Sequence, residues 1–204
     1  MKRVLLALAL LGLMGGAAMA DEFDLSEGVL IVHAPPGVTY STDDDYCALW
    51  DTWRPADCCL DQVNEFTLSD VSGNMFYIVS QFYEPKTFKG IEMGIEYTEL
   101  VPYESGLCWA GLPGLTIEYP GTGSWPYTSG TAIAATSTDA HWSGTCVATH
   151  WIKAYAYTTS ASQVNLVPSA QTGFIGWVST TGSYTPTCVG ALGLGVPGVY
   201  CCSE

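Results

Sequence analysis

Eight cysteines constrain what this 204-residue chain can fold into more than any other feature of its sequence. Four of them form two adjacent pairs, Cys58-Cys59 and Cys201-Cys202. Adjacent cysteines rarely bond to each other, because the ring that they would close is strained relative to normal disulfide geometry. We therefore expect each pair to bond to two different partners and to fix its own backbone from both sides. The other four cysteines are Cys47, Cys108, Cys146 and Cys188.

The spacing of the cysteines favours disulfide bonds over redox chemistry or a zinc knuckle. No C-x-x-C motif is present, so neither a thioredoxin-like site nor a paired zinc knuckle is supported. The sequence leaves the disulfide connectivity open, because eight cysteines can pair in many ways. The pairings that close short local loops are Cys47 with Cys58 or Cys59, and Cys188 with Cys201 or Cys202.

Two groups of residues have the composition of metal sites. The first is His141, Cys146 and His150. If the last two lie on a strand, they are more than about 10 Å apart, beyond the reach of one tetrahedral zinc ion. The second group offers the hard oxygen ligands that calcium prefers, and it consists of Asp43, Asp44 and Asp45. These acids lack the D-x-D-x-D-G spacing of a strong calcium motif, so a solvated loop is the alternative.

Residues 1–20 have the features of a secretory signal peptide. Lys2 and Arg3 form a positive end, residues 4–13 form an apolar run, and Ala18-Met19-Ala20 is a small-x-small cleavage site. The apolar run is too short to span a bilayer. The sequence therefore predicts an exported protein, extracellular or periplasmic, whose mature chain is a single domain over residues 21–204.

The composition is strongly acidic. The formal net charge is −14, and removing residues 1–20 would make it about −16, because these residues contain two basic side chains and no acid. Nucleic acids and anionic lipids bind through lysine and arginine, so both are disfavoured as partners. Such a surface favours solubility, divalent cations or basic partners.

Short strands separated by turns dominate the sequence. Residues 91–97 alternate strictly, which places Ile91, Met93, Ile95 and Tyr97 inward and the glutamates outward. Residues 75–83 are almost continuously apolar, as in a central strand that is buried on both faces. Further strands are expected at 29–34, 115–119, 131–136, 147–157, 164–168, 174–178 and 189–200. We predict an all-β fold, an antiparallel β-sandwich, with a jelly roll or a partly open barrel as alternatives.

One short helix is expected, over residues 58–66. Asp57 is a suitable N-cap, and Leu60 and Val63 lie three residues apart, on what would be the inner face.

Aromatic residues are the most suggestive functional feature. Flat aromatic rings exposed on a rigid sheet bind sugars or partner proteins in many secreted proteins. The alternative is that the rings fill the core. The candidate ligand-binding residues are Trp53, Trp125, Trp151, Tyr155 and Tyr157, of which Trp151, Tyr155 and Tyr157 share one face of the 147–157 strand with Lys153.

Signatures of catalysis are absent from the sequence. Neither the G-x-S-x-G elbow nor the H-E-x-x-H motif occurs. Residues 193–198 match G-x-G-x-x-G, but a dinucleotide site needs a following helix and an acidic residue about twenty positions later. His33 lies in an apolar strand, where a hydrogen-bonded core histidine is the expected role. The sequence therefore predicts a protein that is not an enzyme.

Several segments resemble a set of exported, β-rich bacterial proteins that have no assigned activity. The segments are residues 74–79, 88–97, 151–157, 172–174 and 188–195. The resemblance implies a bacterial secreted protein. The strand at 90–97 is also similar to strands of cohesin-type sandwiches, which bind protein partners.

The leading hypothesis is a secreted, non-enzymatic β-sandwich that acts by surface contact, as a cell-surface, matrix or assembly component. A carbohydrate- or small-ligand-binding module that uses the aromatic residues is the alternative, and a hydrolase of unrecognised type is the third reading. Calcium is the one cofactor considered. Partners are a protein or a glycan at the cell surface, or a second copy of the chain through unpaired strand edges.

Overall fold

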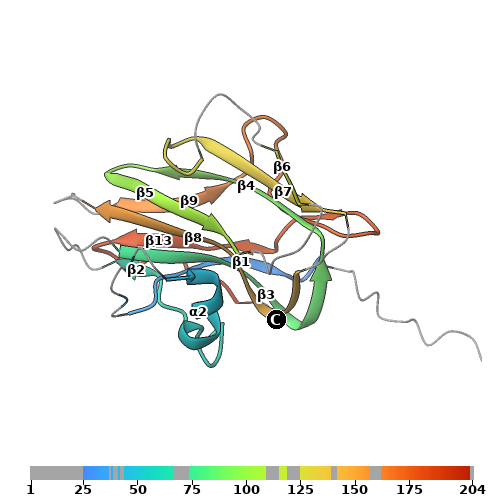
Figure 1. The fold of residues 1–204 in the computed structure, drawn as a ribbon, viewed down its shortest axis with the longest axis horizontal. Coiled ribbons are helices and arrows are strands. Elements are labelled where there is room, and N and C mark those ends of the chain that lie inside the picture. Colours follow the sequence, from blue (N-terminus) through green and yellow to red (C-terminus); the bar gives the residue numbers. More distant parts are fainter. Residues whose placement is uncertain are drawn as a thin grey trace, which may run out of the picture.

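A computed structural model describes residues 25–36, 38, 41, 44–66, 74–108, 115–118, 125–138, 142–156 and 162–202. These residues form thirteen strands and one helix, arranged as two packed sheets with the helix outside (Figure 1). The elements are β1 (Val29–His33), α2 (Tyr46–Trp53), β2 (Glu65–Phe66), β3 (Asn74–Phe88), β4 (Gly90–Tyr97), β5 (Leu100–Leu107), β6 (Leu115–Glu118), β7 (Thr131–Ser137), β8 (Trp142–Ala156), β9 (Ser162–Val167), β10 (Gly176–Val178), β11 (Ser183–Tyr184), β12 (Cys188–Val189) and β13 (Ala191–Leu194).

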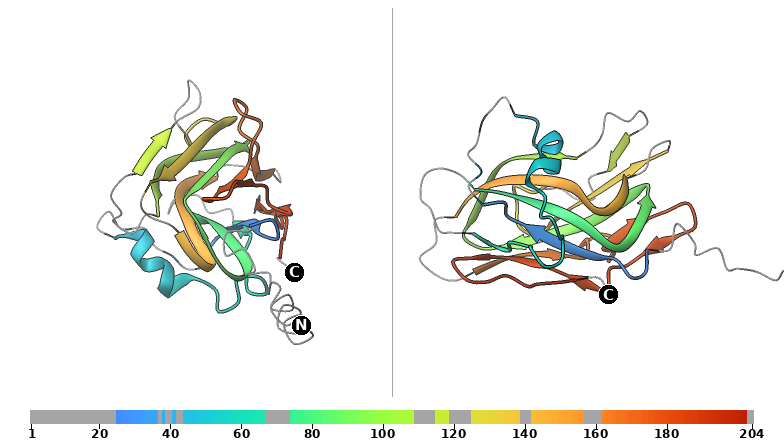
Figure 2. Two further views of the ribbon diagram at one scale, coloured as in Figure 1. Left: turned by 90° about the vertical axis from the view of Figure 1, so that its right-hand side faces the viewer. Right: turned by 90° about the horizontal axis from the view of Figure 1, so that it is seen from below.

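The first sheet has the strand order β12-β1-β3-β8-β5. Its two long strands, β3 and β8, run antiparallel beside each other in the middle of the sheet. As predicted, β3 is a central strand, and residues 75–82 are buried on both faces. One face packs against the second sheet, and the other lies under α2, as Figure 2 shows from two directions.

The second sheet has the order β11-β10-β4-β9-β13-β2, and β7 and β6 extend it on the other side of β4. Along β4, Ile91, Met93 and Ile95 point into the core between the sheets. Glu92 and Glu96 alternate with them on the outer face, as the sequence predicted. The predicted sandwich is thus confirmed, and the described strands do not close into a barrel.

The helix lies earlier in the chain than predicted. It spans Tyr46–Trp53, where the carboxylate of Asp45 accepts hydrogen bonds from the backbone N–H groups of Cys47 and Ala48, at 3.0 and 3.1 Å. Tyr46 and Trp50, one helical turn apart, form the buried face. The prediction failed because the acids before the helix were interpreted as a loop, although one of them is its N-cap.

The predicted helix over residues 58–66 is wrong. Asp57 does cap the backbone N–H groups of Cys59 and Leu60, but the chain makes only one turn before it continues to β2. Leu60 therefore does not face inward: 76% of its surface is exposed.

The disulfides join segments that are far apart in the sequence. They are Cys47–Cys108, Cys58–Cys146, Cys59–Cys202 and Cys188–Cys201. Each adjacent pair bonds to two different partners, as predicted, and the Cys188–Cys201 bond is the expected local one. The expectation that Cys47 bonds to Cys58 or Cys59 is wrong, because the fold places Cys47, on α2, beside the end of β5. Cys59–Cys202 links the two adjacent pairs directly to each other.

Candidate functional site

The predicted aromatic residues Trp53 and Trp151 lie on the outer side of the first sheet, where α2 covers it. Both rings contact Tyr46 of the helix, with ring centroids 6.0 and 4.9 Å away. Trp151 also lies against the backbone of the neighbouring strand, and a side chain at Gly106 would overlap its indole. These tryptophans are half-buried and attach α2 to the sheet.

Tyr155 stacks on Tyr103 of the neighbouring strand, with ring centroids 4.6 Å apart. Between these rings and the helix lies Lys153, whose side chain is 1% exposed. Its ammonium Nζ is 2.9 Å from Oε2 of Glu104 and 4.7 Å from the centre of the Tyr103 ring. Burial lowers the pKa of Lys153 to about 8. This face of β8 therefore fastens β5 and α2 together through aromatic, cation–π and ion-pair contacts.

Trp125 is 5% exposed and lies in the core between the sheets. Its ring meets the ring of His150 edge-on, with centroids 5.0 Å apart. The ring is thus a core residue and offers no surface for stacking. Tyr157 and Trp109 lie outside the described residues.

The acidic loop is described only in part. Asp43 lies outside the described residues, Asp44 is exposed, and the carboxylate of Asp45 caps α2. Among the residues that the structure describes, no three histidine, cysteine or acidic side chains are placed to hold a metal ion. Cys146 is in a disulfide, which removes it from the possible zinc ligands. Calcium binding by the acidic loop stays a prediction.

A recess opens beside Cys58 and Cys59, and we call it and its surroundings the cysteine corner. Its volume is about 780 Å³. The residues that line it are Asp51, residues 54–60, Gln81, Phe82, Tyr83, Thr145 and Cys146. The disulfides Cys58–Cys146 and Cys59–Cys202 hold the wall of the recess to β8 and to the C-terminal segment.

Large apolar side chains project from the cysteine corner. Leu60 and Tyr83 both line the recess, and each has 76% of its surface exposed. Tyr83 projects because β3 loses its pairing with β8 between Gln81 and Lys86. Tyr200 lies alongside and donates a hydrogen bond from its hydroxyl to the Cys59 carbonyl. Three of the six large apolar residues that are exposed in the described part of the chain, Leu60, Tyr83 and Tyr200, belong to this region.

Sequence reasoning missed this surface. Leu60 was assigned to the inner face of a helix, and Tyr83 to a buried strand. One sequence signal points to it. Leu60 directly follows the Cys58-Cys59 pair and Tyr200 directly precedes the Cys201-Cys202 pair, so two disulfide bonds hold the chain beside each residue.

None of the described residues that line the recess at the cysteine corner is a histidine. His33 and His150 are both buried, and burial lowers their pKa values to about 4 and about 3. Each therefore stays neutral near pH 7 and lies buried in the core. His141 lies outside the described residues.

No helix among the described residues is long and apolar enough to cross a membrane.

Comparisons with known proteins give one distant likeness. No protein-family model matches the chain, and no curated protein matches it. A chain in the crystal structure of a type II cohesin–X-dockerin complex from Acetivibrio cellulolyticus, an interface mutant, has 12% sequence identity and a TM-score of 0.42. The likeness covers 64% of this chain and 93% of the other. A likeness of this size implies neither a family nor a partner for this chain.

Proposed function

We propose that this protein is an exported, non-enzymatic binding protein, and that it docks another protein at the cysteine corner. The observation that carries the proposal is a group of exposed apolar side chains beside the Cys59–Cys202 bond: Leu60 and Tyr83 line the recess, and Tyr200 is hydrogen-bonded to Cys59. Water-exposed apolar clusters with a polar rim mark protein interaction sites more often than isolated exposed residues do.

The disulfides favour tight docking at this corner. Binding costs free energy when loops and side chains must be ordered, and a surface that is already fixed avoids part of that cost. Leu60 and Tyr200 are held by the bonds of their neighbours, Cys59 and Cys201. Tyrosine is also enriched among the residues that dominate binding energies at interfaces.

The charge of the chain indicates the chemistry of the partner. The net charge is −14, and Asp51 and Asp57 lie at the recess with one basic residue, Arg54. The Asp51–Arg54 ion pair, 3.6 Å long, is exposed on both sides and is weak. The partner that fits this corner presents an apolar side chain flanked by lysine or arginine, because positive charge speeds association with an acidic surface.

Site-specific photo-crosslinking tests the proposal. A benzophenone amino acid at position 83 should give a covalent adduct with one other protein on intact producing cells. The same amino acid at position 101 is the control, because Val101 is exposed but lies on β5, outside the corner. An adduct at both positions, or between two copies of this chain, contradicts docking of a distinct partner at the corner.

Affinity measurements with the purified partner complete the test. Leu60→Glu and Tyr83→Ala should each weaken binding by at least about fivefold, since loss of a central apolar anchor costs more than about 1 kcal/mol. Val101→Glu should leave the affinity unchanged. Equal affinities for all three variants would refute the proposal.

A further inference from the structure

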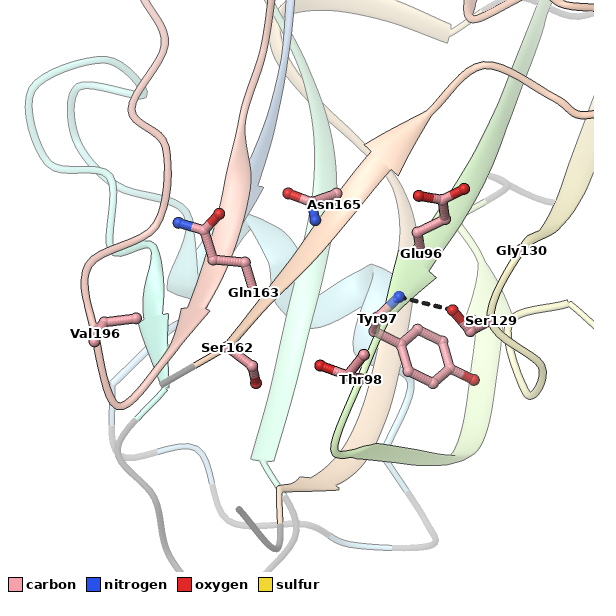
Figure 3. Close-up of a pocket in the computed structure, with 9 residues that line it drawn as sticks. All are labelled: Glu96, Tyr97, Thr98, Ser129, Gly130, Ser162, Gln163, Asn165 and Val196. Atoms are coloured by element: carbon pink, nitrogen blue, oxygen red, sulfur yellow. Dashed lines mark hydrogen bonds between the residues drawn. The ribbon is translucent and has the colours of Figure 1, made fainter. Parts of the chain in front are cut away.

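A second recess crosses the outer face of the second sheet, on the side away from the helix (Figure 3). We call it the polar trough. Its volume is about 690 Å³, within the range of small-ligand sites, about 300–1,000 Å³. The residues that line it are Glu96, Tyr97, Thr98, Ser129, Gly130, Ser162, Gln163, Asn165 and Val196.

The floor of the trough comes from two neighbouring strands in register. Glu96 of β4 pairs directly with Asn165 of β9, and Figure 3 shows their side chains side by side. Residues two apart on a strand share a face, so Gln163 lies on the same outer surface as Asn165. The opposite face of β9 carries Val164 and Leu166, which are buried in the core. A carboxylate and two amides are thus presented together by a rigid sheet.

Two turns form the walls. One is residues 128–130, where Ser129 Oγ accepts a hydrogen bond of 2.9 Å from the backbone N–H of Tyr97. The other is residues 195–198, where the Pro197 carbonyl accepts one of 3.5 Å from Gln163 Nε2. Gly130 and Gly195 have φ values of 82° and 65°, so both turns depend on glycine. The second turn contains most of the G-x-G-x-x-G match.

We infer that the polar trough binds a neutral carbohydrate chain. Sugar hydroxyls are both donors and acceptors, and the lining matches them with a carboxylate acceptor, two amides that donate and accept, and the hydroxyl side chains of Thr98 and Ser129. A hydroxyl bound to a carboxylate makes a stronger hydrogen bond than a neutral pair does. Glu96 is therefore the anchor, and Asn165 and Gln163 extend the contact along β9.

Other ligand classes fit the lining poorly. It contains no basic residue, so Glu96 repels phosphates, nucleic acids and acidic sugars. A single carboxylate is a poor set of ligands for calcium, which prefers several hard oxygen atoms. An apolar ligand would contact few apolar groups, because the described lining offers only Val196 and the ring of Tyr97. The Tyr97 hydroxyl already donates a hydrogen bond of 2.9 Å to the Pro126 carbonyl.

Titration calorimetry with a panel of uncharged hexasaccharides from β-glucan, xylan, mannan and chitin tests the inference. The whole chain should bind at least one of them. Asn165→Ala and Glu96→Gln should each weaken that binding about tenfold, because the first removes hydrogen bonds and the second replaces hydrogen bonds to a charged group by weaker neutral ones. Glu92→Gln is the matched control, since it changes the same charge on the same face of β4, outside the trough. The control should bind like the unaltered chain.

Charge selectivity is the second readout. A uronic-acid hexasaccharide should bind about tenfold more weakly than the best neutral one, and Glu96→Gln should reduce that difference. No binding to any neutral sugar, equal binding by the trough variants and the control, or a preference for the acidic sugar overturns the inference. These outcomes are separable from the docking proposal, because Leu60→Glu and Tyr83→Ala should leave sugar binding unchanged.

Discussion

Acidification from pH 7.5 to pH 5 should lower the free energy of unfolding by about 4 kcal/mol, because two buried histidines must stay neutral in the fold. His33 is buried beneath α2, with its ring edge-on to Trp50. Its Nδ1 accepts a hydrogen bond of 3.1 Å from the backbone N–H of Val63, which a protonated ring cannot accept. His150 lies in the core beside Trp125, and its Nε2 has no hydrogen-bond partner among the residues that the structure describes.

The magnitude follows from the two pKa values. Burial lowers the pKa of His33 from 6.5 to about 4 and that of His150 to about 3. Both folded-state values lie below the unfolded value, so the unfolded chain binds more protons as soon as the pH falls below 6.5. Stability is therefore complete above pH 6.5 and is lost progressively below it. One pKa unit corresponds to about 1.4 kcal/mol, so each histidine costs about 2 kcal/mol at pH 5.

The loss at pH 5 is set mainly by the unfolded-state pKa of histidine, because both folded-state pKa values lie well below that pH. It changes by only about 0.1 kcal/mol whether a folded-state pKa is 3 or 4. Further loss follows below pH 5, as the pH approaches those two values.

Urea unfolding at the two pH values measures the effect. The readout is the difference in unfolding free energy between pH 7.5 and pH 5. The packing cost of a core substitution is the same at both pH values, so it does not affect this difference. His33→Gln and His150→Gln should each reduce that difference by about 2 kcal/mol, and the double variant by about 4 kcal/mol. If the double variant loses as much stability on acidification as the unaltered chain, the reasoning is refuted.

Two further predictions concern packing and cross-linking. Gly106→Ala should lower the free energy of unfolding by about 1–3 kcal/mol, because the added methyl group overlaps the Trp151 indole; unchanged stability in urea would contradict that packing. Removal of Cys59–Cys202 by paired alanine substitutions should cost about 4 kcal/mol, because the other bonds shorten its 143-residue loop to about 45 residues. The same change at Cys188–Cys201, a 13-residue separation, should cost about 3 kcal/mol, and a clearly reversed order would count against the loop-entropy argument.

The fold class could be predicted because its signals are local. Alternation along residues 91–97 requires one buried and one exposed face, and the structure has both. The division of each cysteine pair between two partners follows from ring strain and needs no knowledge of the fold. The identity of each partner depends on tertiary contacts. A preference for short loops therefore predicted the Cys188–Cys201 bond correctly but not the Cys47–Cys108 bond.

The candidate surfaces could not be predicted in the same way. Leu60 and Tyr83 are residues of types that usually lie in the core. No local sequence signal shows that a one-turn segment and an interruption in strand pairing turn them outward. The polar trough joins β4, β9 and two turns that lie far apart in the sequence. Its residue types are ordinary surface residues, so only their register shows that they lie together.

The helix covers the face of the first sheet on which Trp53 and Trp151 lie. In a two-sheet sandwich each outer face meets water, and an aromatic ring there suggests a ligand. Here α2 covers the first sheet, and a second apolar cluster that includes Tyr46, Trp50, Met75 and Tyr77 forms beneath it. The hydroxyl of Tyr77 donates a hydrogen bond of 2.7 Å to the Tyr46 carbonyl, which fixes the helix on the sheet.

Trp53 and Trp151, which pack against this cluster, therefore stabilise the contact between the helix and the sheet. The outer face of the second sheet, by contrast, carries Glu92, Glu96, Gln163 and Asn165 on adjacent strands, and the polar trough crosses it. When a helix covers the outer face of one sheet, the outer face of the other sheet is the one left to bind a ligand. On that face, polar residues alternate with buried residues along neighbouring strands. Trp151→Ala should consequently lower the free energy of unfolding and leave sugar binding unchanged. Asn165→Ala should weaken sugar binding and leave the free energy of unfolding unchanged.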